Sequence, residues 1–116
     1  MNKLKIASSL EDIASSIEEN ETCFVVFYAD WCKPCRDFHE TLEEIAEHTN
    51  IHVVKVSVDL FKEYAMSEPN KVSSIPATVV YKNKEKIDKF VGSQDAKVLK
   101  EKYDKSIEST ESAPSV

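Results

Sequence analysis

Two cysteines separated by two residues, Cys32 and Cys35, are the side chains best suited to covalent chemistry in this sequence. They follow a nearly continuous apolar run, which predicts that they lie where a buried strand passes into a helix. Cys32 would then sit at the helix N-terminus, where free N–H groups and the helix dipole stabilise a thiolate. Cys35 would lie one turn later on the same face. This spacing is typical of thiol–disulfide exchange, in which Cys32 would attack a disulfide and Cys35 would resolve the mixed disulfide.

The two residues between the cysteines fit this interpretation. Pro34 costs little at an early helical position, since its missing N–H would be unpaired there in any case. Lys33 adds a positive charge beside the thiolate, so we expect it to favour the reduced form and to make the oxidised form more oxidising. The effect should be modest, because an exposed lysine is well solvated.

The elements that must position the cysteines alternate along the chain. The apolar run at residues 23–29 predicts a central strand buried on both faces. Apolar residues then recur at helical spacing from Phe38 to Ala46, which predicts an amphipathic helix to about residue 49. Ser8 is expected to open an earlier helix, with Glu11 completing a capping box. The remaining expected strands are residues 3–7, 51–58, 77–81 and 86–91, and the remaining helices are residues 60–66 and 94–107. This order predicts an α/β sandwich with a mixed central sheet of about five strands, flanked by about four helices.

Length and composition suit one domain, which we place at residues 1–107, followed by a disordered tail at residues 108–116.

The chain has 15 Lys and Arg against 21 Asp and Glu, a net charge of −6, which disfavours binding to nucleic acid. Its single glycine, Gly92, excludes the glycine-rich loops that bind nucleotide phosphates. Because no apolar stretch is long enough for a membrane span or a signal peptide, we expect a cytoplasmic protein that does not bind membranes. We also expect the chain to be a monomer.

Three segments, in order and at matching spacing, resemble the thioredoxin family. Residues 29–36, Ala-Asp-Trp-Cys-Lys-Pro-Cys-Arg, are similar to its active-site segment, whose usual form is Trp-Cys-Gly-Pro-Cys. Ile75-Pro76, followed by Ala-Thr-Val-Val-Tyr-Lys-Asn, resembles the family's cis-proline loop and the strand after it. Residues 90–92, Phe-Val-Gly, resemble the loop that completes its substrate groove. The likeness in element order extends from about Lys3 to Tyr103.

The resemblance implies a three-layer α/β/α sandwich that reduces disulfides in target proteins and is recycled by a thioredoxin reductase. It implies no metal, and no cofactor beyond the Cys32–Cys35 disulfide. It also implies a cis peptide bond between Ile75 and Pro76, packed against the cysteine pair. An apolar substrate-binding rim would surround Cys32. The residues implied for this rim and for substrate binding are Trp31, Pro34, Ile75, Pro76, Val91 and Gly92.

The sequence departs from the family pattern next to the cysteines. Thioredoxins usually carry a buried acid six residues before the first cysteine, to which the family assigns proton transfer for the resolving cysteine, and here that position is Val26. Lys55 matches the lysine that normally faces this acid, so we expect Lys55 to lack its usual partner and either to extend toward solvent or to lose its proton. Lys33 and Lys55 are therefore the residues expected to tune the pKa of the thiols. Tyr28 replaces the common tryptophan, and Glu40 the helix-kinking proline. We expect weaker or differently pH-dependent resolution.

Several alternatives stay open. Cys23 enters the buried strand and is interpreted as a small core residue, with a regulatory thiol as the alternative. Cys32, Cys35 and His39 could instead bind zinc, although a fourth ligand is missing. The domain could also be a non-catalytic interaction module. A third alternative is an oxidising or isomerising disulfide catalyst, which Lys33 would favour slightly.

Overall fold

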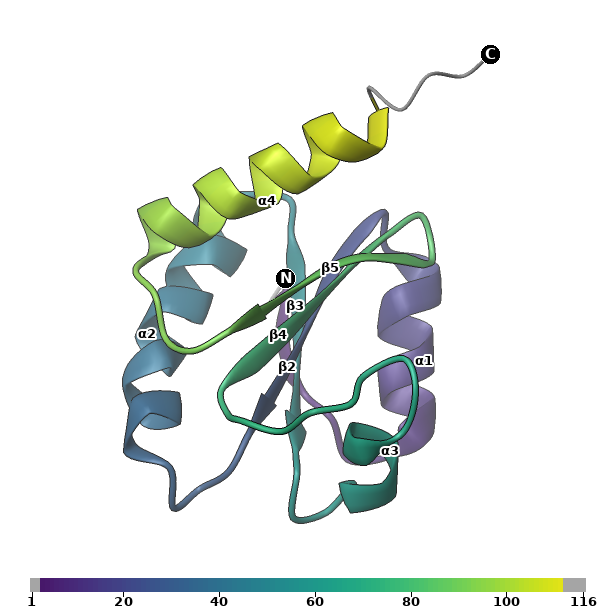
Figure 1. The fold of residues 1–116 in the computed structure, drawn as a ribbon, viewed down its shortest axis with the longest axis vertical. Coiled ribbons are helices and arrows are strands. Elements are labelled where there is room, and N and C mark those ends of the chain that lie inside the picture. Colours follow the sequence, from purple (N-terminus) through teal and green to yellow (C-terminus); the bar gives the residue numbers. More distant parts are fainter. Residues whose placement is uncertain (1–2, 112–116) are drawn as a thin grey trace.

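Five strands and four helices make up the part of the chain that the structure, a computed structural model, describes (Figure 1). This part comprises residues 3–111, with side chains described to residue 108. In chain order the elements are β1 (Leu4–Ile6), α1 (Leu10–Glu19), β2 (Thr22–Tyr28), α2 (Lys33–His48), β3 (His52–Ser57), α3 (Lys62–Met66), β4 (Ala77–Lys82), β5 (Glu85–Val91) and α4 (Ala96–Glu111). The strands form one sheet with the order β1-β3-β2-β4-β5.

Strand β2 is the centre of this sheet. It pairs in parallel with β3 and antiparallel with β4, while β1 joins β3 in parallel and β5 joins β4 antiparallel. Every residue from Thr22 to Phe27 is buried, as the continuous apolar run predicts for a strand covered on both faces. The mixed five-stranded sheet is thus confirmed. The last two expected strands, residues 77–81 and 86–91, form a hairpin, and of the two only β5 lies at the edge of the sheet, because β4 lies between β2 and β5.

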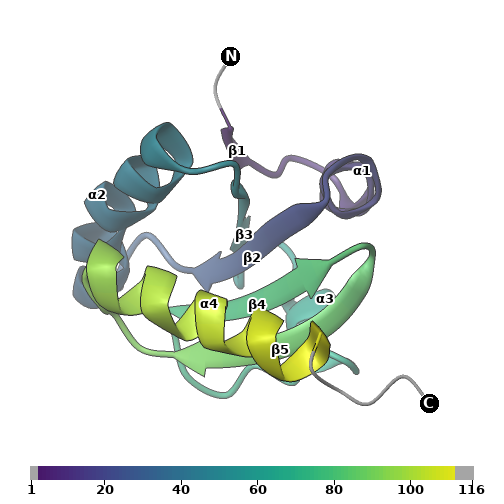
Figure 2. The same cartoon turned by 90° about the horizontal axis from the view of Figure 1, so that it is seen from above.

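Helices cover both faces of the sheet and complete three layers (Figure 2). Successive β2 side chains point to opposite faces, so they divide between two cores. Cys23, Val25 and Phe27 pack with α1 and α3, whereas Phe24 and Val26 pack with α2 and α4. This is the expected α/β/α sandwich. Because β2 and β3 are parallel, the loops that follow them meet at one edge of the sheet.

The start of α1 differs by one residue from the expectation. Ser9, rather than Ser8, is the N-cap, and its hydroxyl accepts a hydrogen bond from the Asp12 N–H at 3.1 Å. The Asp12 carboxylate accepts hydrogen bonds from the N–H and the hydroxyl of Ser8, each at 2.8 Å. These bonds, together with nearby Lys5, lower the pKa of Asp12 to about 2. Asp12 is therefore the acidic residue of the capping box, the role expected of Glu11.

The end of α4 also differs from the expectation. The helix continues to Glu111, so the first residues of the segment expected to be a disordered tail are helical. The rest of that segment, residues 112–116, lies outside the described residues. Asn83 and Lys84 form the turn between β4 and β5, with positive φ values of 51° and 73° that such a two-residue turn requires. Across residues 3–111, no helix is both long enough and apolar enough to cross a lipid bilayer.

Candidate active site

The cysteine pair lies at the start of α2, directly after the loop that leaves β2. Cys32 is the N-cap of α2, and its Sγ accepts a hydrogen bond from the Cys35 N–H at 3.2 Å. The two sulfur atoms form a disulfide, with 5.2 Å between the Cα atoms. Both residues are buried, with Cys32 6% exposed and Cys35 2% exposed. The sulfur of Cys32 is thus held where the first N–H groups of a helix favour negative charge.

Lys33 forms an ion pair on its own helix. Its ammonium lies 3.0 Å from the carboxylate of Asp37, and both side chains are exposed. Arg36 donates from Nη1 to the backbone carbonyl of Asp30 at 2.7 Å, which ties the first turn of α2 to the loop before it. Because Asp37 compensates the charge of Lys33 and water screens it, the N-terminus of α2 is the larger source of positive potential at Cys32.

A second loop packs against the cysteines. The Ile75–Pro76 peptide bond is cis, as the resemblance implies, and Ile75 packs against Cys32 and Cys35. Pro76 is buried, and its carbonyl accepts a hydrogen bond from the Gly92 N–H at 2.8 Å, which joins the loop before β4 to the loop after β5. Gly92 has a φ of +97°, and a Cβ there would meet no atom within 4 Å. The backbone conformation therefore accounts for a glycine at this position, and lack of space does not.

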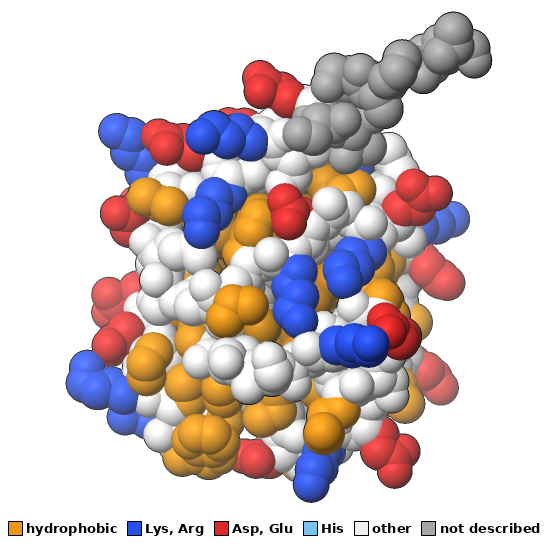
Figure 3. All heavy atoms as spheres, viewed as in Figure 1, with side chains coloured by type: hydrophobic (Ala, Val, Ile, Leu, Met, Phe, Trp, Pro, Cys, Tyr) orange, Lys and Arg blue, Asp and Glu red, His pale blue; other side chains and the backbone are white. Residues whose placement is uncertain are grey.

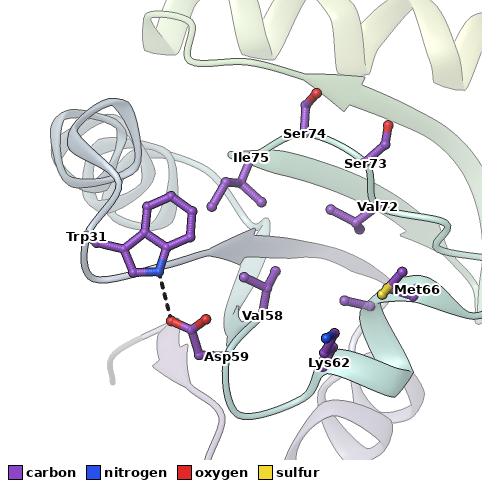
Figure 4. Close-up of a pocket in the computed structure, with 10 residues that line it drawn as sticks. Trp31, Val58, Asp59, Lys62, Met66, Val72, Ser73, Ser74 and Ile75 are labelled. Atoms are coloured by element: carbon purple, nitrogen blue, oxygen red, sulfur yellow. Dashed lines mark hydrogen bonds between the residues drawn. The ribbon is translucent and has the colours of Figure 1, made fainter.

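Exposed hydrophobic side chains gather near the cysteines, at the end of the molecule where β2 passes into α2 (Figure 3). Trp31 is 68% exposed and Val91 is 54% exposed, and Pro34 is exposed as well. Beside them lies a recess of about 350 Å³ between Trp31, the loop before β4 and α3 (Figure 4). Trp31 Nε1 donates a hydrogen bond to the Asp59 carboxylate at 3.0 Å, which orients the indole along this recess.

Asp59 and Met66 are two of the residues of this surface that the sequence did not indicate. Asp59 follows β3, which is parallel to β2, so residues just after these two strands meet. Asp59 could have been found in the sequence, because it is a polar residue directly after the expected strand at residues 51–58, which runs parallel to the strand before the cysteines. Met66 on α3 lines the same recess and is 62% exposed, and nothing in the local sequence distinguishes it from a core residue.

Comparisons with known proteins agree with this geometry. The family model described as Thioredoxin matches residues 5–105. The chain belongs to the thioredoxin family. It is 36% identical over 103 residues to Thioredoxin 1 of Plasmodium falciparum, covering 86% of this chain and 97% of that relative. It is 30% identical over 100 residues to mitochondrial Thioredoxin-2 of Schizosaccharomyces pombe, covering 85% of this chain and 73% of the relative. The solved structure of a thioredoxin mutant from Halobacterium salinarum has a TM-score of 0.81 at 26% identity, covering 89% of each chain.

This thioredoxin-family chain is therefore a thiol–disulfide oxidoreductase that reduces protein disulfides, with the Cys32–Cys35 pair present as its redox-active disulfide. The three-layer sandwich described above is the thioredoxin fold.

The departure from the thioredoxin pattern at Val26 leads to a new partner for Lys55. Val26 is 1% exposed and lies beside Lys55 in the register of β2 and β3. Lys55 Nζ lies 3.0 Å from His39 Nδ1 and 4.3 Å from the centroid of the Tyr28 ring. Burial lowers the pKa of Lys55, while two nearby carboxylates oppose this shift. Lys55 thus lacks the acid that is its usual partner in the family, but it is not left unpaired, because α2 supplies an imidazole and β2 an aromatic face.

These side chains line a second recess, of about 360 Å³, on the inner side of the cysteine pair. Its wall includes both Cys35 and Lys55, so the resolving position of the pair and the buried lysine border a common space. The residues that line it are Tyr28, Ala29, Asp30, Cys35, Arg36, His39 and Lys55. Burial, and the negative charge of Asp30, raise the pKa of Tyr28.

The structure also places the third cysteine and the three residues of the zinc alternative. Cys23 is fully buried in β2 on the face that α1 and α3 cover, and burial raises its pKa to about 12, so it behaves as a core residue. His39 is within 3.0 Å of Lys55 Nζ, and the two sulfur atoms of the thioredoxin pair are bonded to each other. Within the described part of the chain, no three His, Cys, Asp or Glu side chains are grouped as metal ligands would be.

Proposed function

We propose that Cys32 is the thiolate that attacks the disulfide of a target protein and that Cys35 resolves the resulting mixed disulfide. The position of Cys32 Sγ at the N-cap of α2, where it accepts the Cys35 N–H, carries this assignment. In the reduced protein, this hydrogen bond and the helix dipole favour a thiolate on Cys32 over one on Cys35. Cys35 is 2% exposed, so a sulfur already attached to Cys32 is the target it can reach.

The apolar rim around Cys32 is proposed to dock an extended segment of the target. Trp31 and Val91 are both exposed, and Ile75 packs against the cluster of Ala29, Cys32 and Cys35 from the cis-proline loop. Pro76 has no N–H, which leaves the neighbouring backbone groups free to pair with an incoming chain. The proposed substrate-binding residues are those implied by the resemblance, Trp31, Pro34, Ile75, Pro76, Val91 and Gly92, together with Asp59, which orients Trp31.

The proposed cycle needs no metal and no bound cofactor, because the electrons come from the cysteine pair and an NADPH-linked thioredoxin reductase restores the dithiol. We place this cycle in the cytoplasm, since a single free core cysteine beside a redox pair is typical of a reducing compartment. A tagged copy found inside mitochondria would contradict that placement. The chain is proposed to work as a monomer, which analytical ultracentrifugation of the reduced protein would check.

A reductase-coupled insulin-reduction assay tests the assignment of the cysteines. We expect turnover by the natural chain, loss of turnover in Cys32→Ser and Cys35→Ser, and accumulation of a mixed disulfide with insulin in Cys35→Ser alone. Cys23→Ser is the matched control and should retain turnover, because Cys23 lies in the core on the other face of β2. No turnover by the natural chain would instead favour the non-catalytic interaction module.

The direction of electron flow needs its own measurement. We propose a reduction potential close to that of reducing thioredoxins, about −270 mV, rather than that of strong oxidants, about −120 mV. The ion pair between Lys33 and Asp37 supports this, because it reduces the electrostatic advantage that Lys33 would give to the reduced form. A potential near the oxidant value, measured by equilibration with glutathione, would favour the oxidising or isomerising catalyst.

A further inference from the structure

The resolving step requires Cys35 to lose a proton inside the protein. The thiolate is the nucleophile in disulfide exchange, and burial disfavours a thiolate relative to a thiol. Cys35 is 2% exposed and lines the second recess. Val26 lies beside Lys55 on the adjacent strands, so no carboxylate occupies that buried position. A proton acceptor for Cys35 must come from the other groups around the recess.

Three of the titratable groups at the recess are poor acceptors. Tyr28 holds its own proton more tightly than usual, because burial raises its pKa. Arg36 has a guanidinium group with donors and no acceptor atom, and its Nη1 donates to a backbone carbonyl. Asp30 is exposed, so water rather than the buried sulfur is its ready hydrogen-bond partner. Glu43, one turn beyond His39, is also exposed and lies on the far side of the imidazole from Lys55.

His39 and Lys55 differ from these groups because their nitrogens are within hydrogen-bond distance of each other. Nζ and Nδ1 are 3.0 Å apart, so the two bases, both neutral before the step, can hold one added proton between them, and charge repulsion would oppose only a further one. When Lys55 donates, Nδ1 is unprotonated and the ring proton is on Nε2, which is 3.6 Å from the Glu43 carboxylate. Burial lowers the pKa of Lys55, which favours the neutral amine that can take up a proton, although the carboxylates of Asp30 and Glu43 oppose this shift. His39 also follows Cys35 by four residues on α2, which places the two side chains on one face of the helix.

We propose that the His39–Lys55 pair accepts the proton that Cys35 releases when it attacks the mixed disulfide on Cys32. This rests on the proposed role of Cys35 as the resolving thiol. The Cys35 S–H bond breaks and its proton passes to the pair across the recess, which at about 360 Å³ has room for bridging water. The Cys35 thiolate forms the bond to Cys32 while the bond from Cys32 to the target sulfur breaks, so the cysteine pair is oxidised and the target sulfur is reduced. The departing target thiolate then takes a proton from the pair or from solvent at the exposed edge of His39.

Single-turnover kinetics separate this step from the first attack. The reduced protein is mixed with an aromatic disulfide that releases one coloured thiolate when Cys32 attacks and a second when Cys35 resolves. In His39→Asn we expect the second phase to slow by about tenfold or more near neutral pH, with the first phase within about twofold of the natural chain. The difference should shrink at high pH, where Cys35 loses its proton without an acceptor. Lys55→Gln should slow the same phase and shift its pH profile.

The matched control is His48→Asn, the same substitution at an exposed histidine at the other end of α2. It should leave both phases and their pH profiles unchanged. Equal second-phase rates at every pH for His39→Asn and the natural chain would overturn the inference, as would equal slowing of both phases. Cys35→Ser distinguishes this result from failure of the proposed function. If Cys35→Ser lacks the second phase while His39→Asn keeps it, only the role of the pair is wrong, whereas a second phase that persists in Cys35→Ser removes both.

Discussion

Replacing Gly92 isolates the contribution of one backbone conformation beside the cysteine pair. Its φ of +97° lies where residues with a side chain are strained, by about 1–2 kcal/mol for an L-alanine. A Cβ there would meet nothing within 4 Å, so no clash adds to this strain. Alanine also restricts the unfolded chain, which returns about 0.4–1 kcal/mol. We therefore expect Gly92→Ala to lower the free energy of unfolding by about 1 kcal/mol, or the melting temperature by about 4 °C.

Urea denaturation of the reduced protein measures this change. Gly92→D-Ala, introduced by chemical ligation, is the matched control, because a D-residue adopts this φ without strain and should be at least as stable as the natural chain. An unfolding free energy for Gly92→Ala within about 0.3 kcal/mol of the natural value, well below the expected loss, would refute the assignment of strain. So would an equal loss in the D-alanine and L-alanine variants, since that would mean the added methyl group, and not the backbone, carries the cost.

The same position also tests the proposed docking surface. Gly92→Val has at least the strain of Gly92→Ala, because valine is β-branched, and it adds a larger side chain next to Val91, where a Cβ meets open space. We expect it to slow reduction of insulin more than reduction of a small disulfide, because an extended chain passes closer to the loop. Equal loss for both substrates, matching the loss in Gly92→Ala, would mean that the glycine is retained for its backbone alone.

Three further predictions follow from buried or bonded groups. Val26→Asp places a carboxyl group in the core, where burial raises its pKa, so the loss of stability should be larger at pH 8 than at pH 4. The pH profile of turnover should also move. An unmoved profile would mean that the missing acid is irrelevant to the resolving step. Burial raises the pKa of Cys23 to about 12, so this thiol should resist iodoacetamide at pH 8 until the chain unfolds, whereas Cys32 of the reduced protein should react first. Mass spectrometry of the alkylated peptides shows which cysteine was modified. Because the pKa of Asp12 is lowered to about 2, its contribution to stability is complete above pH 4 and is lost as the pH falls toward 2. Asp12→Asn should therefore lose less stability than the natural chain over that pH range. The control is Glu11→Gln, a substitution at the exposed neighbouring residue, which should behave as the natural chain does.

The central strand and the helix after it could be predicted because their signals are local. A strand covered on both faces needs apolar residues at consecutive positions, and residues 23–29 show this directly. A helix with one buried face needs apolar residues at helical spacing, as at Phe38, Leu42 and Ile45. Helix ends were less predictable. Ser8 and Ser9 are equally good caps by type, and the hydrogen bonds of Asp12 to both serines are what separate them.

The sequence by itself determined the chemistry of this protein, because that chemistry depends on neighbours in the chain. A strand end, a helix start and two cysteines one turn apart place Cys32 at the N-cap of α2 whatever the rest of the fold does. Only the tertiary structure decided which groups serve the pair. Trp31 binds Asp59 and Lys55 binds His39 because β2, β3 and α2 come together in space, and segments 28 and 16 residues apart then supply the partners. Each partner is a polar side chain of an ordinary type, so its position in three dimensions, rather than its sequence context, identifies it.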